Sequence, residues 1–362
     1  MSATLPRDPA TANPPPALAV RVTVVIKALD EERHIRAAVD SALVAVARVG
    51  GEVVLADSGS TDRTVAIASA HPVTIVQLRH RSERRCGIGP QLGFQVARGE
   101  FVYILDGDME LHPDFLETAL AAMAADPQLG GVAGMVEERS EASYQFRGRK
   151  RRGHEQAGRG DCEWLDMGGL YRTAALRAVG YFSNRNLHAF EELELGLRLR
   201  AAGWRMCRMP VPGVTHHGRP EGTWALLMRR WHSRYLDGSG ELLRAAIGRP
   251  YFRRALRTQR HLLLALGVWF GLLAGVLALP RTPTPLIAMV GLVALLVGLR
   301  AWRARSLRDA LLGQIVWQVS ALALLRGLLS RPLDPATPVE YVVLSEPRRT
   351  MTFEPQRQAG TV

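Results

Sequence analysis

Apolar and polar positions alternate in blocks over the first part of the chain. Short runs rich in Val, Ile and Leu are each followed by polar or acidic residues and then by apolar positions at helical spacing. Runs of this kind are typical of strands buried on both faces, and their alternation with helices predicts a doubly wound, mainly parallel α/β sheet. The expected strands are residues 22–26, 52–56, 73–77 and 101–105.

A different pattern begins after Arg260, where apolar residues continue without any charge over 262–279 and again over 285–299. The first run reaches the lower length limit of a membrane-spanning helix, and the second reaches it if tilted or extended by its flanks. We expect a transmembrane hairpin, followed at 309–329 by an amphipathic helix that either lies on the membrane or spans it. The alternative is that the hairpin residues are buried core helices of a soluble domain.

These patterns divide the chain into four parts. Residues 1–19 are rich in Pro, Ala and Thr, lack the apolar core of a signal peptide and are expected to be disordered. Residues 20–250 form the α/β domain, 251–330 the membrane-associated helices and 331–362 a C-terminal tail. The three cysteines, Cys86, Cys162 and Cys207, form no CxxC pair, so neither a disulfide framework nor a zinc site is indicated.

The net charge of +12 favours polyanionic partners, and its location selects among them. Many arginines flank the apolar runs, which indicates a cytoplasmic membrane face and not a nucleic-acid partner. These are Arg253, Arg254, Arg257, Arg260, Arg300, Arg303, Arg305 and Arg308. A further basic segment, Arg147 to Arg152, is expected either to meet lipid phosphates or to form a solvated loop.

The segment Asp106-Gly107-Asp108 directly follows the expected strand 101–105. Two carboxylates separated by one small residue suit a hard divalent cation, magnesium or manganese, while the backbone stays close to a diphosphate. A solvated acidic turn is the simpler explanation of the same residues. The strand before the segment and the earlier acidic strand ends favour the metal site.

Several motifs occur together in one order. They are Val24-Val25-Ile26, Asp30-Glu31-Glu32, Asp57 to Asp62, Ala97 to Glu100 and Asp106 to Asp108. This order resembles the family 2 glycosyltransferases with a GT-A fold. The resemblance covers about residues 20–250 and implies metal-dependent, inverting transfer from a nucleotide diphosphate sugar.

The resemblance also implies roles for residues on the donor side. Asp30, Glu31 and Asp57 would lie by the nucleoside, with Asp57 contacting the base, and Asp106 would approach the donor. The alternative for 57–62 is a helix cap and turn. The family's arginine near the phosphates is replaced by Pro90, so Arg84 or Arg85 would supply that charge, unless they belong to a solvated loop. Lys27 stands where the family commonly has proline.

On the acceptor side, the resemblance implies that Gly168 and Gly169 leave room for the acceptor, with tight packing as the alternative. Glu192 takes the position of the catalytic base, Glu191 is its rival, and an acidic first helical turn would also explain both. His216 is a candidate ligand of the metal bound by Asp106 and Asp108, although adjacent histidines are often merely polar.

Together these features predict an enzyme of the inner, cytoplasmic membrane of a bacterium, with its catalytic domain on the cytoplasmic side. Its expected partners are a nucleotide diphosphate sugar, a lipid-linked or membrane-associated acceptor and the bilayer, and its expected role is the assembly of surface polysaccharide or glycolipid. Two alternatives stay open. One is transfer to polyprenyl phosphate, which needs no strong base; the other is a non-catalytic membrane module that binds a nucleotide sugar.

Overall fold

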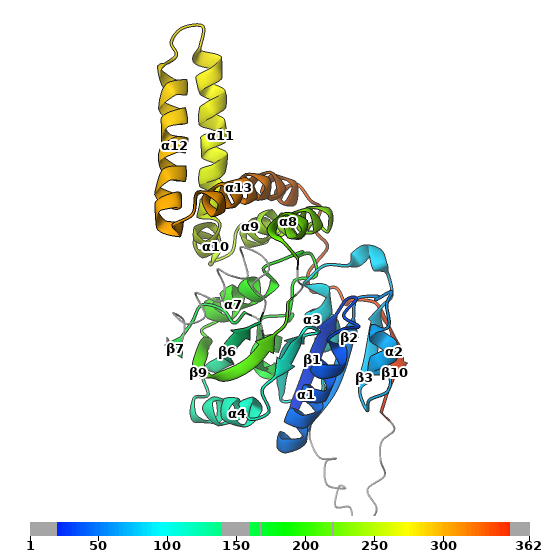
Figure 1. Ribbon diagram of the computed structural model, residues 1–362. Helices are drawn as coiled ribbons and strands as arrows, with labels where there is room; N and C mark the ends of the chain where they lie inside the picture. Colours follow the sequence, from blue (N-terminus) through cyan, green and yellow to red (C-terminus); the bar gives the residue numbers. More distant parts are fainter. Residues whose placement is uncertain (1–19, 140–159, 167, 219–220, 348–362) are drawn as a thin grey trace, which may run out of the picture.

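The computed structural model describes residues 20–139, 160–166, 168–218 and 221–347 of the 362-residue chain. An α/β domain comes first, and long helices stand away from it at one end (Figure 1). The expected N-terminal lead-in 1–19, the basic segment Arg147 to Arg152 and the end of the tail lie outside the described residues.

One mixed sheet forms the centre of the α/β domain. Its first half is parallel as expected, because each strand here returns through a crossover. In spatial order, the strands of this half are β3 (Thr74–Leu78), β2 (Gly51–Asp57), β1 (Val22–Ala28) and β4 (Phe101–Asp106). The second half is not mainly parallel, since it mixes both directions. It comprises β8 (Gly169–Arg172), β6 (Leu129–Glu138), β9 (Arg205–His216) and β5 (Met109–Leu111), with β7 (Gly160–Asp161) beside β9.

Helices cover both faces of this sheet because successive strand residues point to opposite sides. On β1, Val24 and Ile26 join one apolar cluster with α1 and α4, whereas Val25 joins a second cluster with α3. This two-sided burial explains why the strands read as continuous apolar runs. The helices of the domain are α1 (Ile35–Val49), α2 (Thr64–Ala68), α3 (Ile88–Val96), α4 (Phe115–Ala125), α6 (Thr173–Ala178) and α7 (Glu191–Ala201).

Three C-terminal helices are long and apolar enough to cross a membrane: α11 (Arg260–Ala278), α12 (Thr284–Ala304) and α13 (Leu307–Leu328). α11 and α12 form a hairpin that projects from the molecule, while α13 lies across its base (Figure 1). Within the described structure, 0% of the apolar window of α12 and 22% of that of α11 is buried, so the hairpin is not packed as core helices of the α/β domain. The predicted fold class, an α/β domain followed by long apolar C-terminal helices, is confirmed.

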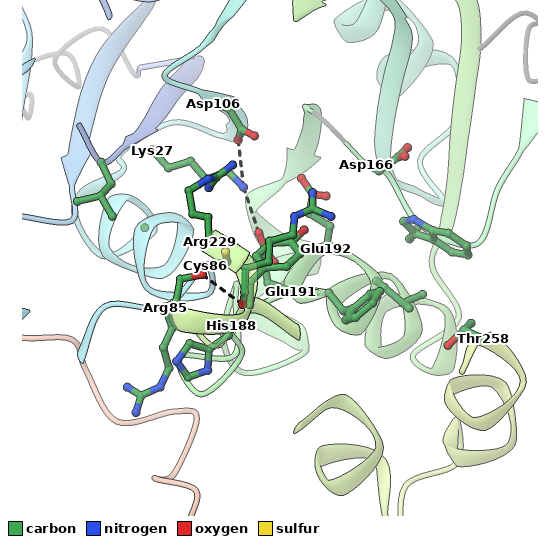
Figure 2. A pocket seen from close by; sticks show the side chains of 18 of the residues that line it. Lys27, Arg85, Cys86, Asp106, Asp166, His188, Glu191, Glu192, Arg229 and Thr258 are labelled. Atoms are coloured by element: carbon green, nitrogen blue, oxygen red, sulfur yellow. Dashed lines mark hydrogen bonds and ion pairs between the residues drawn. The ribbon is translucent and has the colours of Figure 1, made fainter. Parts of the chain in front are cut away.

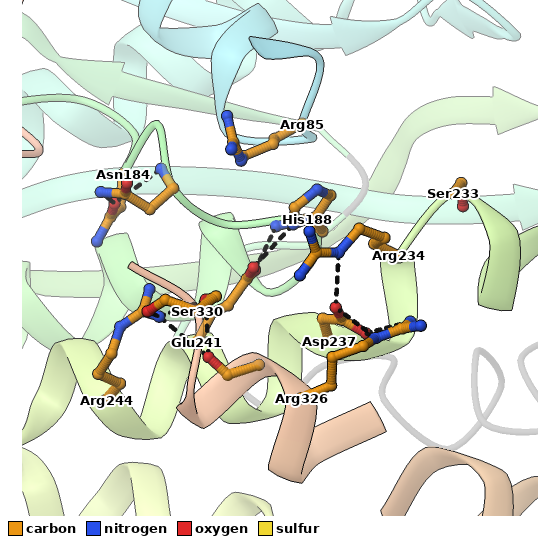
Figure 3. A network of polar contacts seen from close by, with 12 residues as sticks. Arg85, Asn184, His188, Ser233, Arg234, Asp237, Glu241, Arg244, Arg326 and Ser330 are labelled. Carbon is orange, nitrogen blue, oxygen red and sulfur yellow. Dashed lines mark hydrogen bonds and ion pairs between the residues drawn. The ribbon is translucent and has the colours of Figure 1, made fainter. Parts of the chain in front are cut away.

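A close seam joins α13 to α9 (Gly238–Ala246) and, at fewer points, to α8 (Thr223–His232). The short helix α10 (Phe252–Thr258) packs against α9. A Cβ on Gly240 would lie 2.0 Å from the carbonyl oxygen of Leu324, so only glycine permits this approach. The carboxylate of Asp237 is fully buried and accepts hydrogen bonds from Arg326 (Nε to Oδ1, 2.8 Å) and Arg234 (Nε to Oδ2, 2.9 Å; Figure 3). The seam is therefore tightly packed, and the buried negative charge of Asp237 is compensated by arginines.

After α13 the chain returns to the α/β domain, within the segment 331–362 that was expected to be a C-terminal tail. Its strand β10 (Tyr341–Ser345) pairs antiparallel with the edge strand β3. Before it, Arg185 Nη1 donates to the carbonyls of Thr337 and Pro338, both at 2.9 Å. β10 has five residues and pairs with a strand that lies far earlier in the sequence. Such a strand gives little local signal, so the sequence pattern did not indicate it.

The seam gives a first prediction. Gly240→Ala forces α9 and α13 apart, and we expect it to destabilise the protein by about 1–3 kcal/mol through overpacking. The control Gly291→Ala changes a glycine of α12 whose added Cβ has no heavy atom within 4 Å. Thermal unfolding in nanodiscs measures both, and equal midpoints for the two variants would contradict the tight seam.

Candidate active site

The carboxyl ends of β1 and β4 meet the first turn of α7 at a large cavity of about 1450 Å³ (Figure 2). Parallel strands place their carboxyl ends at one edge of a sheet, where ligands of α/β folds bind. The cavity continues from there to α10, α11 and α13. Residues of its wall that matter below are Lys27, Glu31, Ser58, Arg85, Asp106, Asp108, Asp166, Glu191, Glu192 and His216.

Lys27 stands at the centre of the catalytic end of this cavity. Its Nζ lies 3.0 Å from Asp106 Oδ1 and 3.1 Å from Glu191 Oε1, so one cation joins the end of β4 to the start of α7 (Figure 2). Burial opposes the charge, but Asp106, Glu191 and Glu192 hold the pKa of Lys27 well above its usual value. A Cβ on Gly89 would lie 2.9 Å from Lys27 Cβ, so α3 leaves room for this side chain.

The loops after β1 and β2 are clasped together at the nucleotide end. Asp57 Oδ2 accepts hydrogen bonds from the backbone N–H groups of Gly59 and Ser60, both at 2.9 Å, and from Gln77 Nε2 at 2.8 Å. Asp30, with a φ of 55°, accepts from the Thr61 N–H at 2.7 Å. The buried Asp57 carboxylate thus stabilises the loop in which the nucleotide site was predicted. Its direct contact with a nucleobase stays a prediction.

Glu31 and Ser58 represent these two loops in the cavity wall. The Glu31 backbone N–H donates to Thr64 Oγ1 at 2.8 Å, which fixes the first loop on the start of α2. A Cβ on Gly107 would lie 3.1 Å from Glu31 Cγ, so the small residue between the two aspartates lets the loop approach them. Glu31 therefore lies beside the Asp106 to Asp108 segment, and the nucleoside contacts of Asp30 and Glu31 stay predictions.

The structure distinguishes the two neighbouring arginines. Arg84 Nε donates to the Ser58 carbonyl at 2.9 Å, so Arg84 holds the β2 loop. Arg85 also lines the cavity, and burial lowers the pKa of its guanidinium. Within the described residues, Arg85 forms no ion pair and donates only to the Glu83 carbonyl, at 3.3 Å. Of the two, Arg85 is the one with a guanidinium available for a phosphate.

Asp108 and His216 form the predicted metal position. Asp108 Oδ2 lies 3.3 Å from His216 Nε2, and Glu138 Oε2 lies 2.9 Å from His216 Nδ1. Burial opposes the charge of His216, but its contacts with Asp108 and Glu138 raise its pKa to about 9. A histidine with a carboxylate behind its second nitrogen is the arrangement that metal sites use.

The fit of a divalent cation follows from this donor set. Among the described residues, no group of three or more His, Cys, Asp or Glu side chains is arranged to hold a metal ion. Asp106 is paired with Lys27, which leaves Asp108 and His216 as one oxygen and one nitrogen donor. Two protein donors suit a cation whose remaining ligands come from substrate phosphates and water. The residues present therefore fit the predicted metal.

The two candidate bases differ in their surroundings. Glu191 is 8% exposed and is held by Lys27, so its carboxylate is already committed. Glu192 lines the cavity, and no hydrogen bond or ion pair to it occurs among the described residues. Burial raises the pKa of Glu192 to about 8; Lys27 opposes this shift, and Glu191, Asp106 and Asp166 add to it. This geometry favours Glu192 over Glu191 as the base.

The acceptor residues Gly168 and Gly169 are buried outside the cavity wall. Gly168 has a φ of 98°, and a Cβ there would lie 2.8 Å from the Tyr103 hydroxyl. A Cβ on Gly169 would lie 2.9 Å from Leu165 Cδ1. Packing against β4 and Leu165 thus explains both glycines, and their contact with an acceptor stays a prediction.

Two contributors were missed by the sequence analysis. Lys27 was noticed only as a departure from proline, because its partners Asp106 and Glu191 are distant in sequence. Glu138 gave no local signal, and it reaches His216 because parallel pairing of β6 with β9 sets these two residues side by side. A predicted register between these strands would have found Glu138.

Comparison with known proteins identifies the family of the α/β domain. Residues 23–182 match the model of glycosyl transferase family 2. The uncharacterized glycosyltransferase YibD of Escherichia coli (strain K12) is 34% identical over 80 residues, which cover 22% of this chain and about a quarter (23%) of that relative.

A solved structure extends the similarity to most of the chain. The mannosyltransferase PcManGT from Pyrobaculum calidifontis, in complex with GDP-Man and Mn²⁺, superimposes with a TM-score of 0.56 and 23% identity, covering 87% of this chain and 91% of that chain. At this identity the similarity shows the fold. The sequence-based prediction of the family and of a GT-A domain is confirmed by these two findings.

The unpartnered Glu192 gives a pH prediction for any reaction in which it accepts a proton. A carboxyl group must be ionised to act as a base, and its pKa is raised to about 8 by burial. We therefore expect kcat/KM to fall by about tenfold per unit as the pH drops below this value. A pH profile of the full-length protein measures the effect. An acidic limb near the pKa of an ordinary glutamate would show that Glu192 is not the base.

Proposed function

Because this chain carries a family 2 glycosyltransferase domain of the GT-A fold, we propose that it transfers a sugar from a nucleoside diphosphate sugar to a hydroxyl group of a membrane-associated acceptor. One observation carries the proposal. The unpartnered carboxylate of Glu192 lies in the same cavity as Lys27, Asp108 and His216, and this cavity reaches the helices that are long enough to cross a membrane.

The donor is assigned to the strand ends. The clasped loops after β1 and β2, represented in the wall by Glu31 and Ser58, are positioned to hold the nucleoside, and Arg85 is positioned to meet a phosphate. A uridine or guanosine diphosphate sugar is the proposed donor class. The fold shared with a mannosyltransferase solved with GDP-Man and Mn²⁺ supports this class.

Asp108 and His216 would hold the divalent cation, manganese or magnesium, with Glu138 orienting the imidazole. When bound, such a cation stabilises the negative charge of a leaving diphosphate. Asp106 is kept beside this position by Lys27, which also offsets the negative charge that the acidic residues bring together. The protein thus balances charge at this end before any ligand arrives.

The transfer itself is assigned to Glu192. The acceptor oxygen forms a bond to the anomeric carbon while the bond from that carbon to the diphosphate oxygen breaks, and Glu192 takes the hydroxyl proton. The nucleoside diphosphate leaves with the bonding electron pair. Attack from the side opposite the leaving group inverts the anomeric centre. Lys27 holds Glu191, the neighbour of the base, and so fixes the first turn of α7.

Attachment to a membrane follows from the long helices. α11 and α12 are the proposed transmembrane hairpin, and the arginines at their bases favour a cytoplasmic α/β domain at the inner membrane of a bacterium. A domain held there meets acceptors that are themselves anchored in the bilayer. Assembly of a surface polysaccharide or glycolipid is the role that we propose.

The test uses the full-length protein in nanodiscs with a panel of nucleoside diphosphate sugars, a divalent cation and a bacterial lipid extract. Released nucleoside diphosphate is measured for the wild type, Asp108→Ala and Glu192→Gln. We expect Glu192→Gln to lose about 10²–10⁴-fold in kcat, which is the usual contribution of a positioned base. We expect Asp108→Ala to lose most of its activity as well, because the cation would lose a protein ligand. The control Glu117→Gln removes a half-exposed carboxylate on α4, far from the cavity, and should leave the rate unchanged.

The remaining outcomes separate the alternatives. Release that survives Glu192→Gln but not Asp108→Ala would indicate a phosphate acceptor, which needs no strong base. No release from any donor would contradict the proposed transfer and favour a binding module without turnover.

A further inference from the structure

The cavity has a second, basic end beside the base of α11. Arg254 and Arg257 on α10 and Arg260 at the first position of α11 line this end, together with Thr258. They are spaced three residues apart, so they follow one side of a helical path. Figure 2 shows Thr258 on the opposite side of the cavity from Lys27 and Asp106. We call Arg254, Arg257 and Arg260 the arginine row.

No carboxylate balances the arginine row within the described part of the chain. Two arginines of the neighbouring helices show the contrast: Arg229 Nε lies 2.9 Å from Glu221 Oε2, and Arg326 is bound by the buried Asp237. Three exposed like charges at this spacing repel one another. An anionic ligand would remove the repulsion, and guanidinium groups match the oxygens of a phosphate.

Apolar side chains continue from the arginine row toward the hairpin. Leu264 of α11 and Trp317 of α13 also line the cavity. Trp317 is held between Arg300, whose guanidinium carbon lies 3.8 Å from a ring centroid, and His261, at 5.4 Å between ring centroids. α11 begins at Arg260 and is one of the helices long enough to cross a membrane. The basic end therefore lies at the level where a lipid would leave the bilayer.

From this arrangement we infer that the arginine row binds the phosphate of a lipid-linked acceptor. The inference rests on the proposed function, and it defines the acceptor class. The hydrocarbon chain lies beside Leu264 and Trp317, the phosphate lies on the arginine row, and a hydroxyl group beyond the phosphate reaches Glu192. A cavity with Glu192 at one end, and with the arginine row beside apolar side chains at the other, thus fits an amphiphile with a phosphate between its lipid and its sugar.

The arginine row is distinct from a general basic surface for membrane phosphates. Arg253 has the same charge on the same helix and is likewise exposed, yet it does not line the cavity. A surface that only attracts headgroups would use Arg253 as readily as Arg254. The two positions therefore separate a specific phosphate site from attraction to an anionic bilayer.

Binding of a defined probe tests the inference. Full-length protein in nanodiscs of zwitterionic lipid is titrated with farnesyl phosphate, and binding is compared between the wild type and the variant Arg254→Gln/Arg257→Gln. We expect the dissociation constant to rise by about tenfold or more, because charge-assisted hydrogen bonds are lost. The matched control Arg253→Gln should bind as the wild type does. Farnesol, which lacks the phosphate, should bind at least about tenfold more weakly than farnesyl phosphate.

Other arms of the same experiment identify the source of the phosphate. Inorganic phosphate that binds as tightly as farnesyl phosphate, or phosphatidylglycerol in the nanodisc that displaces it completely, would overturn the inference. An equal loss in Arg253→Gln and in the double variant would also overturn it. Because this experiment measures binding without a sugar donor, it can succeed or fail independently of the proposed transfer.

Discussion

The contact of Lys27 with Asp106 and Glu191 is the constraint on which the catalytic end of this protein depends. These three side chains come from β1, β4 and α7, which meet only when the sheet and its covering helices are complete. Without the ammonium group, the buried carboxylate of Glu191 and the partly buried carboxylate of Asp106 would lie near Glu192 with no compensating charge, at an electrostatic cost. In the proposed mechanism, Lys27 thereby lets acidic residues for a cation and for a base share one cavity. It holds Glu191, whereas the adjacent Glu192 forms no hydrogen bond or ion pair among the described residues.

A second set of contacts connects this cavity to the proposed membrane helices. The Glu241 carboxylate on α9 accepts from the His188 backbone N–H at 2.9 Å and contacts His188 Nδ1 at 2.8 Å, so α9 holds the loop that leads into α7 (Figure 3). α9 in turn packs on α13 through the seam at Gly240, and the chain beyond α13 returns to pair with β3. The helices beneath the hairpin therefore support the part of the cavity wall that carries Glu192.

The sequence predicted those features that depend on local patterns. Buried parallel strands such as 22–26, the uncharged hairpin and the acidic strand end at Asp106 each produce a periodicity or a composition that can be read within a short window. The family resemblance led to Glu192 and Glu191 together, because both stand in the first turn of one helix. The structure was needed to separate them, because the ion pair of Lys27 with Glu191 joins residues that are 164 positions apart in sequence.

What the sequence could not indicate has one physical origin, which is pairing between distant segments. Glu138 reaches His216 only through the register of β6 with β9. β10 pairs with β3 because the chain returns to the α/β domain after the long helices. Asp57 shows the opposite limit. Its position at a strand end was predicted, but the hydrogen bonds that commit its carboxylate to Gly59, Ser60 and Gln77 depend on the detailed course of the loop.

A double-mutant cycle between Lys27 and Glu191 tests the central role of this ion pair most directly. The rate of sugar transfer is measured for Lys27→Met, Glu191→Gln and the double variant in nanodiscs, with donor and acceptor held constant. Removal of Lys27 alone leaves Glu191 and Asp106 uncompensated, so we expect Glu191→Gln to restore part of the lost rate, with a coupling free energy of about 1–3 kcal/mol. Losses that simply add would contradict the account, because Lys27 and Glu191 would then act independently.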